Sequence, residues 1–306
     1  MPEYRPKKKK KTRAGSVALS LLVFVLFLSI FGGDFLWAII NNRLPTDGAS
    51  SAASEEAGPH FTGEDVRWLF IAAQDGSEPR GFVAVRADPQ NGRIHAVAVP
   101  KETEVADGTT LIRLDELFRK NGVAAAQAAV GNLLGVSFPH YVSMTYANIE
   151  KLLQYFDSSL QFTLTEDLDC REGDYFIKMN SGRYTLTPKQ AVDILRYPSW
   201  QHKGLQQQAD IHAEMLAALV NQYMTAGRES QLEADFSKVA ELAKTDIRIS
   251  HFTAYRESLQ ALAKANGGAV CTPVSLEGRY VGGGEDKRFA ADGAAEQMTR
   301  LFGETH

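Results

Sequence analysis

The chain opens with one long apolar run and continues as a mixture of short strand and helix patterns. Residues 17–33 carry no charged side chain. Together with residues 14–16 they reach the roughly 20 residues that a bilayer core requires. Asp34 ends the run, and the aromatic segment 35–37 follows, where amphipathic rings favour a membrane interface. The pattern predicts a transmembrane anchor over residues 14–40.

The charge before the apolar run predicts its orientation. Arg5, the lysines at 7–11 and Arg13 are opposed only by Glu3. Because basic flanks stay on the cytoplasmic side, residues 1–13 are predicted to be a cytoplasmic tip, with the C-terminal domain extracytoplasmic. A cleaved signal peptide, cut within residues 48–53, is the alternative, but the apolar run is longer than a typical signal core. An uncleaved, single-pass protein of the cell membrane is therefore favoured.

The composition beyond the anchor indicates a linker and one domain. Residues 41–62 are rich in Ser, Ala, Gly, Pro and Glu, as a flexible linker is. Residues 63–306 have the length and apolar content of a folded domain. The chain has a net charge of −4 despite its basic tip, so this domain is acidic. An acidic domain and a tip too short to fold argue against a nucleic-acid partner.

Strand and helix patterns are mixed along residues 63–306, which predicts a layered α/β (α+β) fold. An Asn-Gly turn at 91–92 joins two runs as a hairpin. Strands are expected at 68–72, 81–87, 93–99, 141–145, 160–164, 175–179 and 269–276. Helices are expected at 114–120, 123–134, 148–156, 188–197, 205–224, 232–244, 252–265 and 291–302.

Short local motifs do not identify a reaction or a binding site. The chain has no nucleophile elbow, phosphate loop or zinc-type spacing, and its seven histidines are scattered. The carboxylates of residues 166–174 are typical of a solvated acidic loop, and the glycines at 282–284 of an ordinary loop. Cys170 and Cys271 fit no metal spacing, and a disulfide between them stays open.

Two segments nevertheless resemble the LytR-CpsA-Psr (LCP) family of cell-envelope proteins. The first is Val-Ala-Val-Pro-Lys-Glu-Thr at 97–103, similar to a family signature like Ile-Pro-Arg-Asp-Thr. The second runs from Gly182 to Tyr197 and is followed by Gly204 and the glutamines 206–208. It is similar to the family's Leu-x-Gly-x-Gln-Ala-Leu-x-Tyr-x-Arg helix and Gly-Arg-x-x-Arg-Gln-Gln helix start. Order and spacing match over about residues 66–226.

This resemblance implies a fold, a reaction and partners. The fold is a single domain with a mixed central sheet flanked by helices, placed after an N-terminal anchor. Members transfer glycopolymers from a polyprenyl pyrophosphate carrier to peptidoglycan, so the implied partners are a polyprenyl-linked glycan, peptidoglycan and the membrane. The reaction is phosphoryl transfer assisted by a divalent metal such as Mg2+, which needs cations around the pyrophosphate and an apolar trough for the lipid.

Several charged positions of the family are changed here. Lys101 and Glu102 replace the signature Arg and Asp, and Arg196 matches the first arginine of the helix end. The family's metal-holding Asp at the start of the hairpin strand aligns with Arg80, and a later Asp aligns with Thr145. These changes argue against Mg2+ and leave the metal ligands unknown.

Further arginines of the family are absent. The second arginine of the helix end falls on Pro198, and those of the later motif fall on Leu205 and near Gln208. The resemblance thus implies catalytic roles for Lys101, Glu102 and Arg196. It implies ligand binding by Gln207, Gln208 and Arg80.

Two hypotheses follow. The chain is a transferase with a remodelled site, or it is a catalytically degenerate relative that binds a lipid-linked glycan or an envelope protein. Each lost charge-assisted hydrogen bond removes on the order of 1.5–3 kcal/mol, which favours the second. Simpler roles also exist: Lys101 and Glu102 as a solvated pair, Arg196 as a helix C-terminal cation and the glutamines as helix surface.

Overall fold

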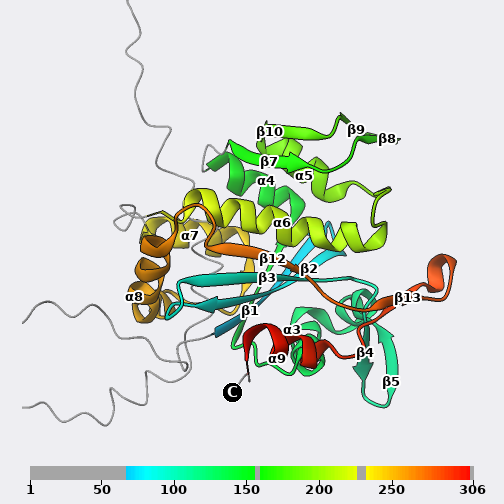
Figure 1. Cartoon of the computed structure of the whole chain (residues 1–306), viewed down its shortest axis with the longest axis horizontal. Coiled ribbons are helices and arrows are strands. Elements are labelled where there is room, and N and C mark those ends of the chain that lie inside the picture. Colours follow the sequence, from blue (N-terminus) through cyan, green and yellow to red (C-terminus); the bar gives the residue numbers. More distant parts are fainter. Residues whose placement is uncertain (1–66, 156–158, 226–231, 304–306) are drawn as a thin grey trace, which may run out of the picture.

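A six-stranded mixed sheet forms the centre of the molecule (Figure 1). The computed structural model describes residues 67–155, 159–225 and 232–303. The strand order is β11-β6-β1-β2-β3-β12. The strands are β1 (Arg67–Asp75), β2 (Glu78–Asp88), β3 (Arg93–Val99), β6 (His140–Thr145), β11 (Lys244–Thr245) and β12 (Cys271–Ser275).

Helices cover both faces of this sheet, which confirms the predicted α/β class (Figure 1). One face carries α3 (Leu114–Leu134) and α9 (Ala294–Phe302). The other carries α4 (Tyr146–Tyr155), α5 (Pro188–Arg196), α6 (Leu205–Tyr223), α7 (Leu232–Leu242) and α8 (Ile249–Ala265). The arrangement is a three-layer domain in which each sheet face buries its own apolar core.

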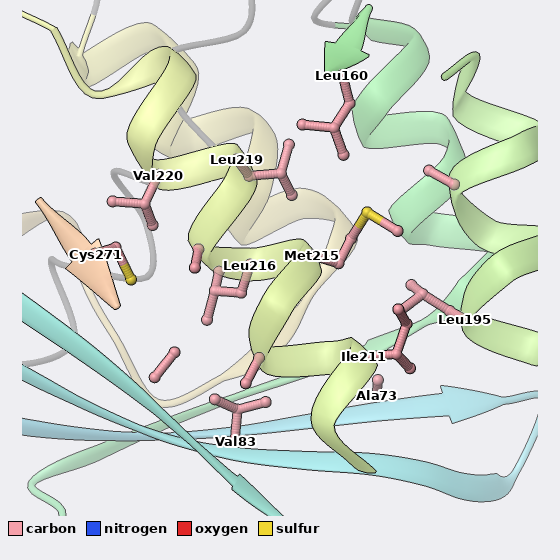
Figure 2. Packing of buried hydrophobic residues seen from close by; sticks show 14 of the residues in the cluster. Ala73, Val83, Leu160, Leu195, Ile211, Met215, Leu216, Leu219, Val220 and Cys271 are labelled. Atoms are coloured by element: carbon pink, nitrogen blue, oxygen red, sulfur yellow. The ribbon is translucent and has the colours of Figure 1, made fainter. Parts of the chain in front are cut away.

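Side chains that alternate along the strands contribute to two separate apolar cores, one on each face of the sheet. In β2, Val83 and Val85 join the core under α6, whereas Phe82 and Ala84 join the core over α3. Successive side chains of a strand point to opposite faces, so one buried strand supplies both layers. Figure 2 shows the core under α6, with the apolar side of that helix turned toward the strands and α5. Its members there include Ile211, Met215, Leu216, Leu219 and Val220.

The β1–β2 pairing contains an irregularity that matters for the site. Ala73 pairs with Gly81, but the next residue, Gln74, pairs with Pro79. Arg80 is therefore the extra residue of a β-bulge. A bulge interrupts the alternation and turns the side chain of the extra residue.

Short two-stranded sheets occupy the rim of the domain (Figure 1). They pair β4 (Glu104–Asp107) with β5 (Thr110–Arg113), β7 (Leu160–Leu164) with β10 (Gly182–Leu186), β8 (Leu168–Glu172) with β9 (Tyr175–Met179), and β13 (Arg279–Val281) with β14 (Arg288–Ala290). A short 3-10 helix (Gly284–Asp286) connects the strands of the last of them and begins at the final residue of the expected glycine loop, 282–284. More than half of the segment 166–174, expected to be an acidic loop, is strand, because β8 (Leu168–Glu172) carries Asp169 and Glu172.

Two helix predictions illustrate how local sequence fixes an element. The helices expected at 114–120 and 123–134 meet at Gly122, whose φ of 81° and ψ of −175° interrupt α3. Only glycine adopts such a conformation readily. At α5, Thr187 and Gln190 form a reciprocal capping box, and Pro188 occupies the first turn.

The expected basic tip, anchor and linker lie outside the described residues. Within the described ranges, no helix is long and apolar enough to cross a bilayer. Cys170 in β8 and Cys271 in β12 are free, buried thiols, and burial raises the pKa of both.

Candidate functional site

A buried hydrogen-bonded pair, Tyr146 and His212, lies at the centre of the site. The hydroxyl of Tyr146 is 2.9 Å from His212 Nε2 and 3.1 Å from the carbonyl oxygen of Leu195. His212 Nδ1 donates to the carbonyl oxygen of Gln208 at 3.0 Å. A carbonyl only accepts, so Nδ1 carries the proton and Nε2 is an acceptor. The single proton of the Tyr146 hydroxyl is therefore shared between Nε2 and the carbonyl oxygen of Leu195. The pair links the start of α4 to the first half of α6.

Gly81 makes this arrangement possible. A Cβ atom at this position would lie 2.3 Å from Cδ2 of His212 and 2.4 Å from Cγ. The imidazole therefore packs directly on the backbone of β2. Since His212 is buried in α6, its ring has little room to move away.

Arg196 and Arg80 both act on Tyr146. The Arg196 Cζ atom lies 5.6 Å from the centre of the Tyr146 ring, and Arg196 Nη2 donates to Asp75 Oδ1 at 2.9 Å. Burial raises the pKa of Tyr146, while Arg80 and, to a lesser degree, Arg196 oppose that rise. Tyr146 belongs to the core on the α6 side of the sheet. Regular alternation would point Arg80 to the other side, so the bulge explains why Arg80 reaches Tyr146.

Lys101, in the turn after β3, acts electrostatically on His212. Residues 100–103 form a closed turn, in which the backbone N–H and the hydroxyl of Thr103 both donate to the carbonyl oxygen of Pro100. The carbonyl oxygen of Lys101 accepts from the Asp115 N–H at 2.9 Å, which attaches the turn to α3. The pKa of His212 falls to about 4, chiefly through burial, with Lys101 a further cause. Arg80, Lys101 and Arg196 therefore each act on one member of the buried pair, and we refer to them as the cationic group.

Glu102 is held away from solvent by its own partners. Its carboxylate lies 3.8 Å from Lys101 Nζ and 3.9 Å from Arg113 Nη2. Arg113 in turn makes a two-point contact with Asp115, at 2.6 and 2.9 Å. Burial raises the pKa of Glu102, and Lys101 and Arg113 oppose the rise. The simple alternative of a solvated Lys101–Glu102 pair is therefore wrong for Glu102, which is 5% exposed.

The two glutamines are buried, which rules out a role as helix surface. Gln207 Nε2 lies 3.3 Å from both carboxylate oxygens of Glu214, and the backbone oxygen of Gln208 orients His212. Their described contacts support α6 and the buried pair. Direct ligand binding by Gln207 and Gln208 stays a prediction.

An apolar cavity of about 90 Å³ lies beside the buried pair. It is enclosed by β1, β2 and β6 below and by α4, α5 and α6 above. Its lining includes Ala73, Val83, Met144, Leu195, Met215 and Leu219, together with Gly81 and His212. Because His212 lines the cavity and also belongs to the buried pair on which the cationic group acts, apolar space and positive charge adjoin each other here.

The state of His212 predicts a pH dependence of stability. An unfolded histidine has its ordinary pKa of 6.5, but burial lowers the pKa of the folded His212 to about 4. Above pH 6.5 the imidazole is neutral in both states, so the stabilisation is complete. As the pH falls from 6.5 to 4, only the unfolded state gains the proton, and about 3 kcal/mol is lost from the free energy of unfolding.

Urea unfolding at stepped pH values measures this loss. His212→Gln should remove this part of the loss and leave the part due to His95, whose pKa burial also lowers to about 4. His202→Gln, at an exposed histidine, should leave the curve unchanged. An equal slope in the wild type and in His212→Gln would contradict the assignment of a neutral, buried His212.

The LytR_cpsA_psr family model matches residues 62–299, which is most of the chain. The chain belongs to the LytR_cpsA_psr family.

Known relatives show how distant this member is. It is 24% identical over 204 residues to the polyisoprenyl-teichoic acid–peptidoglycan teichoic acid transferase TagV of Bacillus subtilis (strain 168). That match covers 62% of this chain and 51% of the relative, so it spans about half of that protein.

Solved structures share the LytR_cpsA_psr fold. The crystal structure of B. subtilis TagV superposes with a TM-score of 0.64 and 17% identity, covering 79% of this chain and 98% of that one. A transcriptional regulator from Enterococcus faecalis gives 0.63 and 15%, covering 79% and 90%. TagT bound to LIIa-WTA gives 0.60 and 12%, covering 79% and 92%. These identities support the fold alone.

The donor set does not fit the divalent metal that the resemblance to the LytR_cpsA_psr family implies. Hard cations such as Mg2+ take several oxygen ligands. Asp75 is occupied by Arg196, and Glu102 by Lys101 and Arg113. The Thr145 hydroxyl accepts from the Asn148 N–H at the start of α4. In the part of the chain that the structure describes, no group of three or more His, Cys, Asp or Glu side chains is placed to hold a metal ion.

Four residues of the site were not found from the sequence. Asp75, Gly81, Tyr146 and His212 carry no motif, and Tyr146 and His212 are 66 positions apart. The bulge at Arg80 offered one signal, since a proline and a glycine on either side of it, Pro79 and Gly81, are typical of an irregular strand. The buried pair itself becomes visible only when α4 and α6 are packed.

Proposed function

We propose that this protein binds a polyprenyl-(pyro)phosphate-linked glycopolymer in the bacterial cell envelope and attaches it to peptidoglycan. The observation that carries the proposal is the cationic group beside the apolar cavity. A polyprenyl phosphate has this dual character, because its head is anionic and its tail is apolar. Membership of the LytR_cpsA_psr family and the similarity to TagV support the same ligand class.

The side chains have separable tasks in this proposal. Arg80, Lys101 and Arg196 neutralise the phosphate oxygens, and a guanidinium offers two parallel donors to such an anion. The first apolar groups of the lipid enter the cavity between α6 and the sheet. The ring of Tyr146 contacts the guanidinium of Arg196, and the hydrogen bond to His212 orients the Tyr146 hydroxyl.

The transfer step requires charge stabilisation more than covalent chemistry. A hydroxyl of the acceptor attacks the phosphorus that carries the glycopolymer, and the bond from that phosphorus to the bridging oxygen breaks. Polyprenyl phosphate leaves with the bond electrons, and the hydroxyl proton passes to solvent. Negative charge grows on the leaving oxygens, which preorganised cations stabilise.

We further propose that residues 14–40 anchor the protein in the membrane, with residues 1–13 in the cytoplasm. A linker over 41–62 would keep the domain close to the outer leaflet, since about twenty residues span at most roughly 70 Å. The lipid carrier of the proposed substrate resides in the same membrane. The anchor thus increases the local concentration of domain and substrate for one another.

One observation favours the second candidate, a family member that binds the lipid-linked ligand without transferring it. Glu102, at the position of the signature Asp, is buried and engaged by Lys101 and Arg113. A carboxylate committed in this way is a poor candidate for direct contact with an acceptor.

The two candidates are separated by a turnover experiment. The full chain is reconstituted in lipid vesicles with a polyprenyl-pyrophosphate-linked glycan and peptidoglycan. A transferase releases polyprenyl phosphate and yields glycan-bearing peptidoglycan, and both products disappear in Arg196→Ala. Binding of the lipid-linked glycan without either product would select the non-catalytic candidate, and no binding would reject both.

A further inference from the structure

Arg80 differs from the other members of the cationic group in its partners. Arg196 is paired with Asp75 at 2.9 Å, and Lys101 lies 3.8 Å from Glu102. Arg80 makes no ion pair with any of the residues that the structure describes. Its side chain is only partly exposed. The bulge breaks the strand alternation at Arg80, and its charge acts on Tyr146 in the core on the cavity side of the sheet. It is therefore a positive charge that is positioned but not compensated.

The carboxylates nearest to this charge are already engaged. Asp75 balances Arg196, and Glu102 is buried between Lys101 and Arg113. A divalent cation entering the site would lack free anionic ligands, and it would meet the repulsion of an uncompensated guanidinium. A phosphate group would instead be attracted by the unpaired guanidinium of Arg80. It would also be attracted by Lys101 and Arg196, whose charges it would share with Glu102 and Asp75.

We propose that Arg80 takes the place of a divalent cation, so that this chain binds the phosphate groups of its ligand through three cationic side chains without a metal ion. The inference rests on the proposed function, because it concerns how the same site holds the same class of ligand. A guanidinium supplies positive charge and two directed donors at a fixed position. The bulge at Arg80 is the structural device that delivers it.

The test measures binding of geranyl pyrophosphate to the full chain in detergent micelles by calorimetry, once in EDTA and once in magnesium chloride. Wild type should bind with the same affinity in both. Arg80→Gln should weaken binding about tenfold or more in both, because one charge-assisted hydrogen bond is lost. Arg80→Asp should bind poorly in EDTA and regain affinity in magnesium, since the new carboxylate favours a metal.

Two further variants keep the result interpretable. Arg80→Lys retains the charge without the fork and should give intermediate affinity that EDTA does not change. Arg119→Gln removes an arginine of α3 whose partner is Glu78 at 3.6 Å, on the start of the same strand, and should bind like wild type. Thermal unfolding of each variant establishes that it is folded.

The outcomes separate the inference from the function. Wild-type binding that requires magnesium would overturn the metal-free site and leave the proposed function standing. Full affinity in Arg80→Gln would overturn the role of Arg80. A wild type that binds geranyl pyrophosphate under neither condition would overturn the proposed function, and the inference with it.

Discussion

Arg196→Ala is expected to lower the rate of glycopolymer transfer by about 10²- to 10³-fold, the range seen when a preorganised charge donor is removed from a reaction centre. If the protein only binds, the expected loss is about 10- to 150-fold in affinity for an isoprenoid pyrophosphate. The physical reason is that Arg196 is held on both sides, by Asp75 at 2.9 Å and by the Tyr146 ring at 5.6 Å. Its guanidinium is thus oriented before any ligand arrives.

Arg196→Lys and Arg183→Ala serve as its matched controls. Arg196→Lys keeps the charge but loses the fork, and should retain part of the activity. Arg183 lies exposed on β10, outside the cationic group, so Arg183→Ala should change neither rate nor affinity. If Arg196 acted only as a cation at the C-terminus of α5, the result would differ. Arg196→Ala would then reduce the free energy of unfolding by about 0.3–1 kcal/mol and leave binding intact.

Gly81→Ala is expected to reduce the free energy of unfolding by about 3 kcal/mol, at the upper end for overpacking of a tight core. The new methyl group would enter the space of the His212 ring, 2.3 Å from Cδ2. The ring is buried, and it is tied to Tyr146 and to the Gln208 carbonyl. Relief therefore requires a backbone shift or the loss of both hydrogen bonds. Denaturant unfolding of wild type and variant measures the difference.

A double-mutant cycle identifies the cause. In the His212→Ala background the methyl group of Gly81→Ala has room, so the substitution should destabilise the protein by at least about 1 kcal/mol less than it does in wild type. This difference is the coupling energy of the two positions, and residues in contact typically show about 0.5–3 kcal/mol. Gly267→Ala is the control, because a Cβ there meets nothing within 4 Å, and should stay within about 0.5 kcal/mol of wild type. Equal costs of Gly81→Ala in both backgrounds would contradict direct packing of β2 on His212.

Local sequence predicted those elements whose signals are local. The bounds of β3, β7 and β9 agree with the expected 93–99, 160–164 and 175–179. Their apolar residues alternate or form short runs between turn residues, and that signal needs no tertiary information. The start of α5 was equally readable from Thr187 and Pro188.

Other elements could not be read in the same way. In β8 and β13 the side chains are mostly polar or exposed. These strands form because they pair with the other strand of their hairpin, and their sequences show little alternation of apolar and polar residues. The hairpin β4–β5 is similar, with Leu111 exposed at 60%. Propensity is overridden there by tertiary context, as is common for short rim strands.

The residues of the site likewise differ in how far the sequence predicts them. Lys101, Glu102 and Arg196 were predicted from motifs, but their surroundings were not. The burial of Glu102 depends on Arg113 and Asp115 from another hairpin and helix. The reach of Arg80 depends on a bulge, and the Tyr146–His212 pair depends on the packing of two helices. Motifs name residues, whereas the roles of those residues follow from contacts made across the fold.

The most direct test of this account is a crystal structure of the protein with geranyl pyrophosphate. The account predicts phosphate oxygens within hydrogen-bonding distance of Arg80, Lys101 and Arg196, and the first isoprene unit in the cavity between α6 and the sheet. Pyrophosphate bound away from all three side chains, or a lipid chain outside that cavity, would contradict it.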